Sequence, residues 1–239
     1  MDDLNKVTSE YKAEAVSAIE NNLILHWYPQ RIVERFGHCK NLLELGIGHG
    51  FTAAIFNAAT DHHTIVEGSS NVIDEFKRAN STLNIDLQYG YFESFEENKK
   101  YDVIIMGFVL EHVDNPAFIL NHFKKFMELG CRLFIAVPNA KSLNRRLGLE
   151  LGLIDDIYSL NANDRALGHK RQYCRDTLKA EVEALGYRIV YEEGIYLKPL
   201  PLDVLKTLKD FEANLQAMLH VGIEFPDLCV GLLMEIELL

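Results

Sequence analysis

The sequence is poor in cysteine and in positive charge, and it contains no long hydrophobic run. Its four cysteines lie far apart and form no CxxC pair or Cys/His cluster, so neither a disulfide framework nor a zinc site is indicated. We expect reduced thiols, as in a cytoplasmic protein. The longest apolar run, residues 103–110, is too short to span a bilayer, and the acidic N-terminus lacks the pattern of a signal peptide.

Positive charge is outnumbered: 24 Lys and Arg residues face 35 Asp and Glu, which gives a net charge of -11. Because an acidic surface repels nucleic-acid phosphates and anionic lipid headgroups, neither nucleic acid nor a membrane is expected as the main partner. The chain of 239 residues is 48% hydrophobic, which is typical of one folded globular domain.

Apolar strand-like segments alternate with helical patterns through the first 140 residues. Strands are predicted at 41–45, 64–68, 85–90, 101–107 and 132–138, and helices at about 51–59, 70–83 and 116–128, the last ending near Gly130. Such alternation predicts an α/β fold with a doubly wound, mostly parallel, Rossmann-like sheet. A helix at 172–185 and strands at 187–196 and 228–238 would complete seven strands, the last of them antiparallel.

Three glycines follow the first strand in the stretch LLELGIGHGF, at Gly46, Gly48 and Gly50. Phe51 stands where the dinucleotide pattern G-x-G-x-x-G has its third glycine, and no Walker lysine follows, so a phosphate site is not indicated. The glycines alone fit either a tight turn or a close approach of a ligand to the backbone. Glu67, at the end of the second strand, lies near the offset at which a carboxylate binds ribose hydroxyls. Glu44 sits inside an apolar strand, where a charge requires a partner.

Five segments in order, LLELGIGHG, VEGSS, GYFESF, YDVIIMGFVLEHVDNP and LFIAVPNAKS, resemble the motifs of class I S-adenosylmethionine-dependent methyltransferases. The resemblance covers about residues 40–140 and implies S-adenosyl-L-methionine as the cofactor. This sulfonium nucleoside carries no phosphate, which agrees with the glycine pattern.

The resemblance also implies roles for the matching positions. Glu44 and the three glycines would hold the methionine part of the cofactor, and Glu67, with the adjoining Gly68 and Ser69, would bind the ribose. Tyr91 and Phe92 lie where the adenine contacts fall, although many relatives have an acid at the position of Tyr91. Phe108 and Val109, just after the fourth strand, would line the sulfonium and methyl region.

Two histidines are candidate bases for a methyl transfer. His112, in LEHVDNP after the fourth strand, titrates near neutral pH when unperturbed, and Glu111 beside it would orient a group. His169, in GHKRQY, is predicted to lie over the same edge of the sheet. The alternative interpretations are that His112 only packs on the cofactor and that His169 is an ordinary loop residue. A related quinone-precursor subgroup has an acid where this chain has Phe108, so no metal site is expected.

The region 141–175 is locally basic, with seven Lys and Arg against four acids. This charge favours an anionic acceptor, such as a phosphate, a carboxylate or a nucleotide-linked sugar, although a solvated helix face with local ion pairs is an equal alternative. The predicted acceptor-binding residues are Arg145, Arg146, Lys170, Arg171 and Tyr173.

These observations predict a single methyltransferase domain with three kinds of segment. Residues 1–38 would form a helical cap, with a helix over 8–36 divided near Pro29; residues 40–140 would bind the cofactor, and 141–171 and 197–227 would bind the substrate or act as lids. The predicted acceptor is a small-molecule hydroxyl, of a sugar or an anionic biosynthetic intermediate. N-methylation of an amino sugar or another small amine, an NAD-type dehydrogenase and a non-catalytic cofactor-binding protein are alternatives. The sequence leaves a homodimer open.

Overall fold

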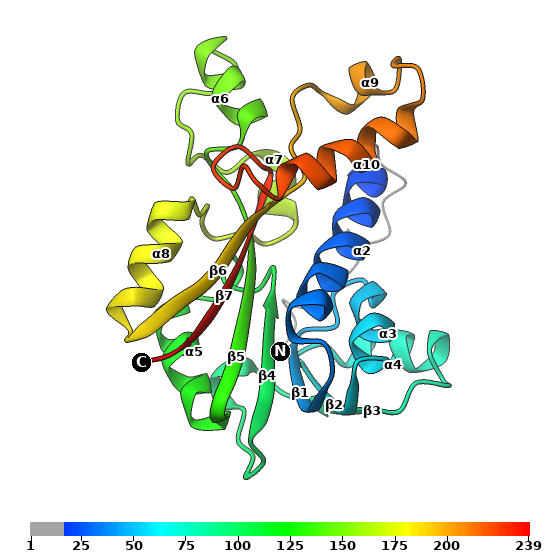
Figure 1. Ribbon diagram of the computed structural model, residues 1–239, viewed down its shortest axis with the longest axis vertical. Helices are drawn as coiled ribbons and strands as arrows, with labels where there is room; N and C mark the ends of the chain where they lie inside the picture. Colours follow the sequence, from blue (N-terminus) through cyan, green and yellow to red (C-terminus); the bar gives the residue numbers. More distant parts are fainter. Residues whose placement is uncertain (1–16) are drawn as a thin grey trace.

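The computed structural model describes residues 17–239, and these form a seven-stranded sheet in the order β3-β2-β1-β4-β5-β7-β6 (Figure 1). Strand β7 pairs antiparallel with both β5 and β6, and the other neighbours are parallel. This topology confirms the predicted doubly wound sheet with an antiparallel last strand. The strands are β1 (Cys39–Leu45), β2 (Thr60–Glu67), β3 (Ile85–Tyr89), β4 (Tyr101–Gly107), β5 (Met127–Pro138), β6 (Tyr187–Ile195) and β7 (Gly231–Leu238).

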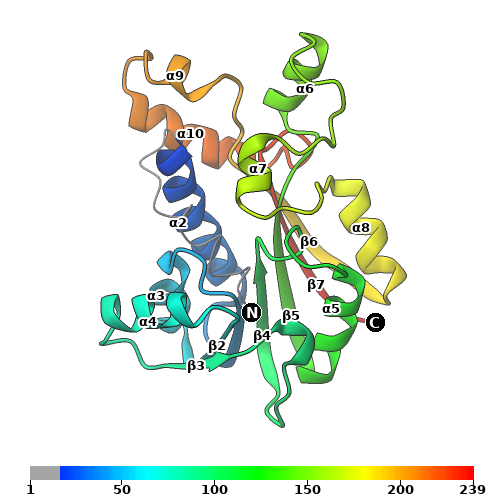
Figure 2. The same cartoon turned by 180° about the vertical axis from the view of Figure 1, so that it is seen from behind.

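Helices cover both faces of this sheet (Figures 1 and 2). One face packs against α5 (Pro116–Phe123) and α8 (Arg175–Ala184). The other packs against α2 (Ser17–Phe36), α3 (Phe51–Asn57), α4 (Ser70–Ala79) and α10 (Phe211–Gly222). The remaining helices are η2 (Phe92–Ser94), η3 (Lys124–Phe126), α6 (Leu143–Glu150), α7 (Ala162–Ala166) and α9 (Leu202–Leu205). Among the helices of residues 17–239, none is long and apolar enough to cross a membrane.

The start of β5 differs from the prediction. The helix predicted over 116–128 ends at Phe123, and β5 begins at Met127, so Gly130 lies inside a strand and does not end a helix. Tyr101 pairs with Met127 but Val103 pairs with Arg132, which means that β5 carries extra residues between these pairs. Gly130, with a φ of +79°, lies in this irregularity, where glycine can adopt a left-handed conformation without strain.

Helix α2 runs through Pro29 without a break, so the predicted division near this residue is wrong. Residues 8–16 of the predicted helix lie outside the described part of the chain. Ion pairs on the C-terminal side of Pro29 attach the helix to the sheet. Arg31 pairs with Glu193 of β6 at 2.8 Å, and Arg35 pairs with Glu235 of β7 at 2.9 Å. Both carboxylates are buried. This anchoring stabilises the helix despite the hydrogen bond that proline removes.

Two segments outside the central α/β unit stand at the carboxyl ends of the parallel strands, at the top of Figure 1. The first carries α6 and α7 and follows β5; the second carries α9 and α10 and lies between β6 and β7. In open α/β sheets this is the edge at which ligands bind.

Candidate active site

A cavity of about 740 Å³ opens at the carboxyl ends of β1, β2 and β4. Its floor is formed by the loops that follow these strands. Its walls are side chains of α2 and of the segment that carries α6 and α7. A volume of this size suits a small-molecule ligand.

The glycine turn forms one end of this cavity. Gly46, Gly48 and Gly50 all have positive φ, between +53° and +83°, so the backbone between β1 and α3 takes a course that other residues would adopt only with strain. A Cβ atom on Gly50 would also lie 3.1 Å from the ring of Phe76. The ring of Phe92 lies near Gly46 and lines the cavity. This end exposes backbone rather than side chains to a ligand.

Glu67 is positioned by backbone amides. The amide of Ile47 donates to Glu67 Oε2 at 3.0 Å, and that of Ser69 donates to Oε1 at 2.7 Å. The carboxylate therefore connects the glycine turn to the start of α4. Burial raises its pKa, and its hydrogen bonds with Ile47, Ser69 and Gly68 oppose the shift. Glu67 and Ser69 line the cavity, whereas Gly68 does not.

Glu44 also reaches the cavity, but its partners come from the core. Thr52 donates a hydrogen bond to Glu44 Oε1, and His63 Nε2 lies 3.0 Å from Oε2. Both Glu44 and His63 are almost fully buried. The buried acid therefore has two protein partners: His63 on the neighbouring strand β2 and Thr52 in the first turn of α3.

The chain leaves β4 through a strained residue. Phe108 has a φ of +57°, which is rare for a residue with a large side chain and is typical of functional sites. Its amide donates to the carbonyl of Ala136 at 2.8 Å, and its ring meets that of Tyr28 edge-on at 5.4 Å between centroids. Phe108 and Val109 both line the cavity.

At the other end of the cavity, Glu111, His112 and His169 form a Glu/His cluster. One potential ligand atom from each residue lies within 4.8 Å of the others, and the two imidazole rings meet edge-on at 4.7 Å. Glu111 is completely buried, and within residues 17–239 neither of its carboxylate oxygens has a hydrogen-bond partner. Burial raises the pKa of Glu111 to about 8 and lowers that of His112 to about 4.

The cluster is held together by contacts between two distant segments. The amide of Lys170 donates to the carbonyl of Glu111 at 2.8 Å. The guanidinium of Arg171 donates to the carbonyls of Leu110 and Asp114, at 2.7 Å and 3.0 Å. These bonds place His169 beside His112, although the two residues are far apart in the sequence.

Four other predicted site residues do not line the cavity. Tyr91 is 41% exposed, outside it. Tyr173 is buried in the core, and its hydroxyl donates to Glu181 at 2.8 Å. Arg146 is exposed and donates to the Lys141 carbonyl at 2.6 Å. Arg171 bonds backbone carbonyls as described above. The side chains of Arg146, Arg171 and Tyr173 therefore bind other parts of the fold, and that of Tyr91 is exposed.

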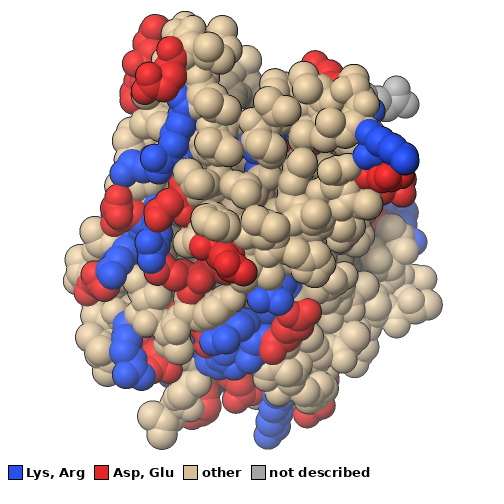
Figure 3. Space-filling view, turned by 45° about the horizontal axis from the view of Figure 1, so that its top comes forward, with Lys and Arg blue, Asp and Glu red and all other residues tan. Residues whose placement is uncertain are grey.

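Most basic side chains of 141–175 are bound to groups of the protein itself. Lys141 pairs with Asp176, Lys170 with Asp114, and Arg175 with Glu192. Arg145 lines the cavity together with Lys170, but its guanidinium donates to the carbonyls of Ile157 and Ser159, each at 2.7 Å. Figure 3 shows Lys and Arg interspersed with Asp and Glu over the visible face. The local excess of positive charge is therefore largely engaged within the fold.

The predicted helical cap over residues 1–38 named no site residue, and the side chains that α2 contributes to the cavity were not identified from the sequence. Glu20, Asn21, Ile24, Leu25 and Tyr28 line the cavity at helical spacing. The amphipathic pattern could have shown that this face is turned inward, but not which loops it covers. From the segment 197–227 only Lys198 reaches the cavity, where it pairs with Glu20 at 2.7 Å.

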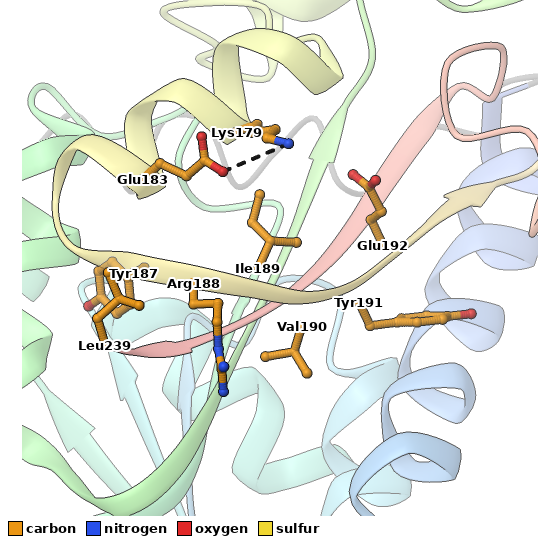
Figure 4. A pocket seen from close by; sticks show the side chains of 9 residues that line it. All are labelled: Lys179, Glu183, Tyr187, Arg188, Ile189, Val190, Tyr191, Glu192 and Leu239. Carbon is orange, nitrogen blue, oxygen red and sulfur yellow. Dashed lines mark ion pairs between the residues drawn. The ribbon is translucent and has the colours of Figure 1, made fainter.

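A second hollow, of about 620 Å³, lies at the sheet edge between α8 and β6 (Figure 4). Ile189 points toward α8, whereas Arg188 and Val190 point to the other side of the strand. The hollow therefore follows the exposed edge of the sheet on both sides of β6 and is not an enclosed pocket. None of the predicted site residues lines it.

Known proteins match both the sequence and the fold. A family model described as "Methyltransferase domain" matches residues 21–192. A ubiquinone biosynthesis O-methyltransferase of Rickettsia bellii is 26% identical over 126 residues, which are 51% of this chain and 52% of that protein. The chain thus spans about half the length of the curated relatives it matches.

Solved structures share the architecture at low sequence identity. The N-methyltransferase NodS of Bradyrhizobium japonicum, solved with S-adenosyl-L-homocysteine, has a TM-score of 0.62 at 13% identity and covers 98% of this chain and 97% of its own. An S-adenosylmethionine-dependent methyltransferase of Mesorhizobium loti has a TM-score of 0.61 at 12% identity and covers 89% of this chain and 97% of its own. With the matched family model and the sheet order, these findings show that the chain belongs to the class I S-adenosylmethionine-dependent methyltransferases.

Proposed function

We propose that this protein transfers the methyl group of S-adenosyl-L-methionine to a hydroxyl of a small molecule. The observation that carries the proposal is that one cavity joins the glycine turn, the carboxylate of Glu67 and the Glu/His cluster. A nucleoside cofactor at the first two and an acceptor at the third would meet inside one cavity. The family membership supports methyl transfer, and the name of the Rickettsia relative supports oxygen as the accepting atom, whereas NodS is named an N-methyltransferase.

The cofactor would lie along the ends of β1 and β2. Its methionine part would rest on the backbone of Gly46 to Gly50, and its ribose hydroxyls would donate to Glu67. Phe92 would lie against the adenine, and Phe108 and Val109 would border the sulfonium. The absence of a Walker lysine agrees with a ligand that has no phosphate.

Methyl transfer is an in-line displacement. The acceptor oxygen attacks the methyl carbon, the carbon–sulfur bond breaks, and its electron pair remains on sulfur in S-adenosyl-L-homocysteine. The acceptor also loses a proton, and we assign its removal to the Glu/His cluster. His112 can take this proton because burial keeps its ring neutral, and its hydrogen bond to the Gly168 backbone leaves the other ring nitrogen with a free lone pair.

The acceptor side of the cavity favours a polyhydroxylated molecule such as a sugar. Arg145 and Lys170, its predicted anion-binding cations, already have protein partners. The Oδ1 atom of Asn144 is buried without a hydrogen-bond partner within residues 17–239, and so could accept from a ligand hydroxyl. The wall is rich in side-chain amides, contributed by Asn21, Asn144, Asn161, Asn163 and Gln172. The Rickettsia relative is named an O-methyltransferase, which agrees with oxygen as the accepting atom.

Calorimetric titration with S-adenosyl-L-homocysteine and with NAD⁺ tests the cofactor. We expect micromolar or tighter binding of S-adenosyl-L-homocysteine and no heat with NAD⁺; the reverse result would overturn the proposal. Transfer of a radioactive methyl group to matched neutral, phosphorylated and amino sugars then tests the acceptor. Preferential labelling of the neutral sugars at oxygen is expected, and labelling of the amino sugars alone would assign N-methylation instead.

A further inference from the structure

We propose that Glu111, His112 and His169 form a binding site for a divalent transition-metal cation. Potential ligand atoms of the three side chains lie within 4.8 Å of one another, and all three residues line the cavity. Two imidazoles and one carboxylate are a donor set that binds zinc and related cations in proteins.

The strongest support is Glu111, whose carboxyl group is fully buried without a partner within residues 17–239. A buried polar group normally has a hydrogen-bond or metal partner, because otherwise its desolvation is not compensated. The Nδ1 atom of His169 is a second such group: it has no hydrogen-bond partner there, and the nearest carboxylate oxygen, of Asp164, is 3.6 Å away. A cation held by the cluster would supply the partner that Glu111 lacks.

The surroundings resemble those of a metal site. His112 hydrogen-bonds the Gly168 backbone, and metal-bound histidines commonly use their second nitrogen in this way. The neighbouring cations, Lys170 and Arg171, are held by Asp114 and by backbone carbonyls. Both are therefore engaged outside the cluster.

The sequence alone argued against a metal because Phe108 stands where a related subgroup has an acid. The fold supplies a different third donor, His169, from the segment between α7 and α8. Imidazole donors favour zinc and similar cations over magnesium, which prefers oxygen. Such a cation would lower the pKa of a hydroxyl that contacts it, which is the chemistry that the proposed O-methylation requires. With the cation bound, His112 is its ligand and the hydroxyl loses its proton to solvent; His112 acts as the base only in the site without a cation. Only this catalytic role rests on the proposed function; cation binding does not.

The test is titration of the chelator-treated chain, without a histidine tag, with zinc chloride and with magnesium chloride. We expect one equivalent of zinc, bound at least about tenfold more tightly than magnesium. Glu111→Gln and His169→Gln should each weaken zinc binding at least about tenfold. His62→Gln, an exposed histidine outside the cluster, should bind zinc like the parent.

Circular dichroism shows whether each variant folds, and cobalt(II) absorption of the His169→Gln variant provides a second readout if Glu111→Gln does not fold. The proposal is overturned if the parent binds no zinc, or if the cluster variants bind it as tightly as the parent. Binding of S-adenosyl-L-homocysteine is measured on the same samples. If the protein binds S-adenosyl-L-homocysteine but not zinc, only the proposed cation site is wrong. If it does not bind S-adenosyl-L-homocysteine, the proposed methyl transfer is wrong.

Discussion

The hydroxyl of Tyr28 occupies the space that a side chain on Gly107 would need. A Cβ atom at Gly107 would lie 3.0 Å from Tyr28 Cζ and closer still to the hydroxyl. Tyr28 belongs to α2 and Gly107 ends β4, so this contact sets how closely the helix approaches the loop that carries Phe108 and Glu111.

Gly107→Ala should therefore destabilise the fold by about 1–3 kcal/mol, because Tyr28 is buried and has little room to move. Denaturant unfolding followed by circular dichroism measures the change. Gly148→Ala is the matched control: its Cβ would meet nothing nearer than 3.9 Å, and alanine favours the helix in which it lies. Equal stability of the two variants would show that the position of Tyr28 does not require glycine at residue 107.

Removal of the imidazole in His112→Ala should lower turnover about 10²–10⁴-fold and leave the affinity for S-adenosyl-L-homocysteine within about twofold. The reason is that His112 lies in the Glu/His cluster, away from the glycine turn. Steady-state rates and calorimetry measure the two quantities. An unchanged rate would mean that His112 only packs in the cavity wall.

Glu67→Ala should weaken binding of S-adenosyl-L-homocysteine about tenfold or more, because a charged hydrogen-bond acceptor for the ribose is lost. The same change frees the amide of Ile47, so a loosened turn could produce part of the effect. A 2′-deoxy analogue separates the two causes. The parent should lose affinity for the analogue, whereas Glu67→Ala should bind both ligands equally; an equal loss in both proteins would refute the ribose role.

Cofactor affinity should also depend on pH through Glu67. Burial raises the pKa of this carboxyl above its usual 4.5, and the ribose requires the ionised form. Affinity is therefore expected to be constant near neutral pH and to fall as the pH is lowered through the raised pKa, beginning above pH 4.5. Calorimetry over a pH series, with circular dichroism to confirm folding, measures this. A flat profile down to pH 4.5 would contradict the assignment, and Glu67→Ala should lack the transition.

The attachment of α2 can be tested at Arg31. Its guanidinium binds the fully buried carboxylate of Glu193, so Arg31→Met should cost about 3 kcal/mol by leaving a buried charge without its ion-pair partner. Arg188→Met, which removes an exposed partner of Glu237, should cost less than about 1 kcal/mol. Denaturant unfolding measures the free energy of unfolding of both variants. Similar losses would show that the ion pair between Arg31 and Glu193 contributes little to stability.

The sequence predicted the strands well where local pattern and burial agree. The apolar run at 101–107 is β4 to the residue, because a central parallel strand is covered on both faces. The beginning of β5 was missed because residues 127–131 continue a helical pattern, and only pairing with β4 makes them a strand. Tertiary contact here overrides local preference.

The sequence could bring together the glycines and Glu67, at the proposed cofactor end of the cavity, for a similar reason, since they lie at fixed offsets along the chain. The acceptor end depends on contacts between distant segments. Nothing near Arg171 in the sequence shows that its guanidinium would bond the carbonyls after β4. The left-handed backbone of Phe108 and the role of Tyr28 likewise depend on the assembled fold.

The two buried acids that hold α2 have a consequence for how ligands reach the cavity. Glu193 and Glu235 belong to the sheet, and the helix supplies Arg31 and Arg35 as their partners. If this helix moved away, Glu193 would lose its counterion and Glu235 would keep only Arg132, so a movement of α2 that admits a ligand is unfavourable. The opposite wall is formed by α6 and α7. Among the ion pairs within residues 17–239, none joins either of these helices to β6 or β7. We therefore expect small molecules to enter and leave on that side, past Asn144 and Asn161, while α2 stays in place.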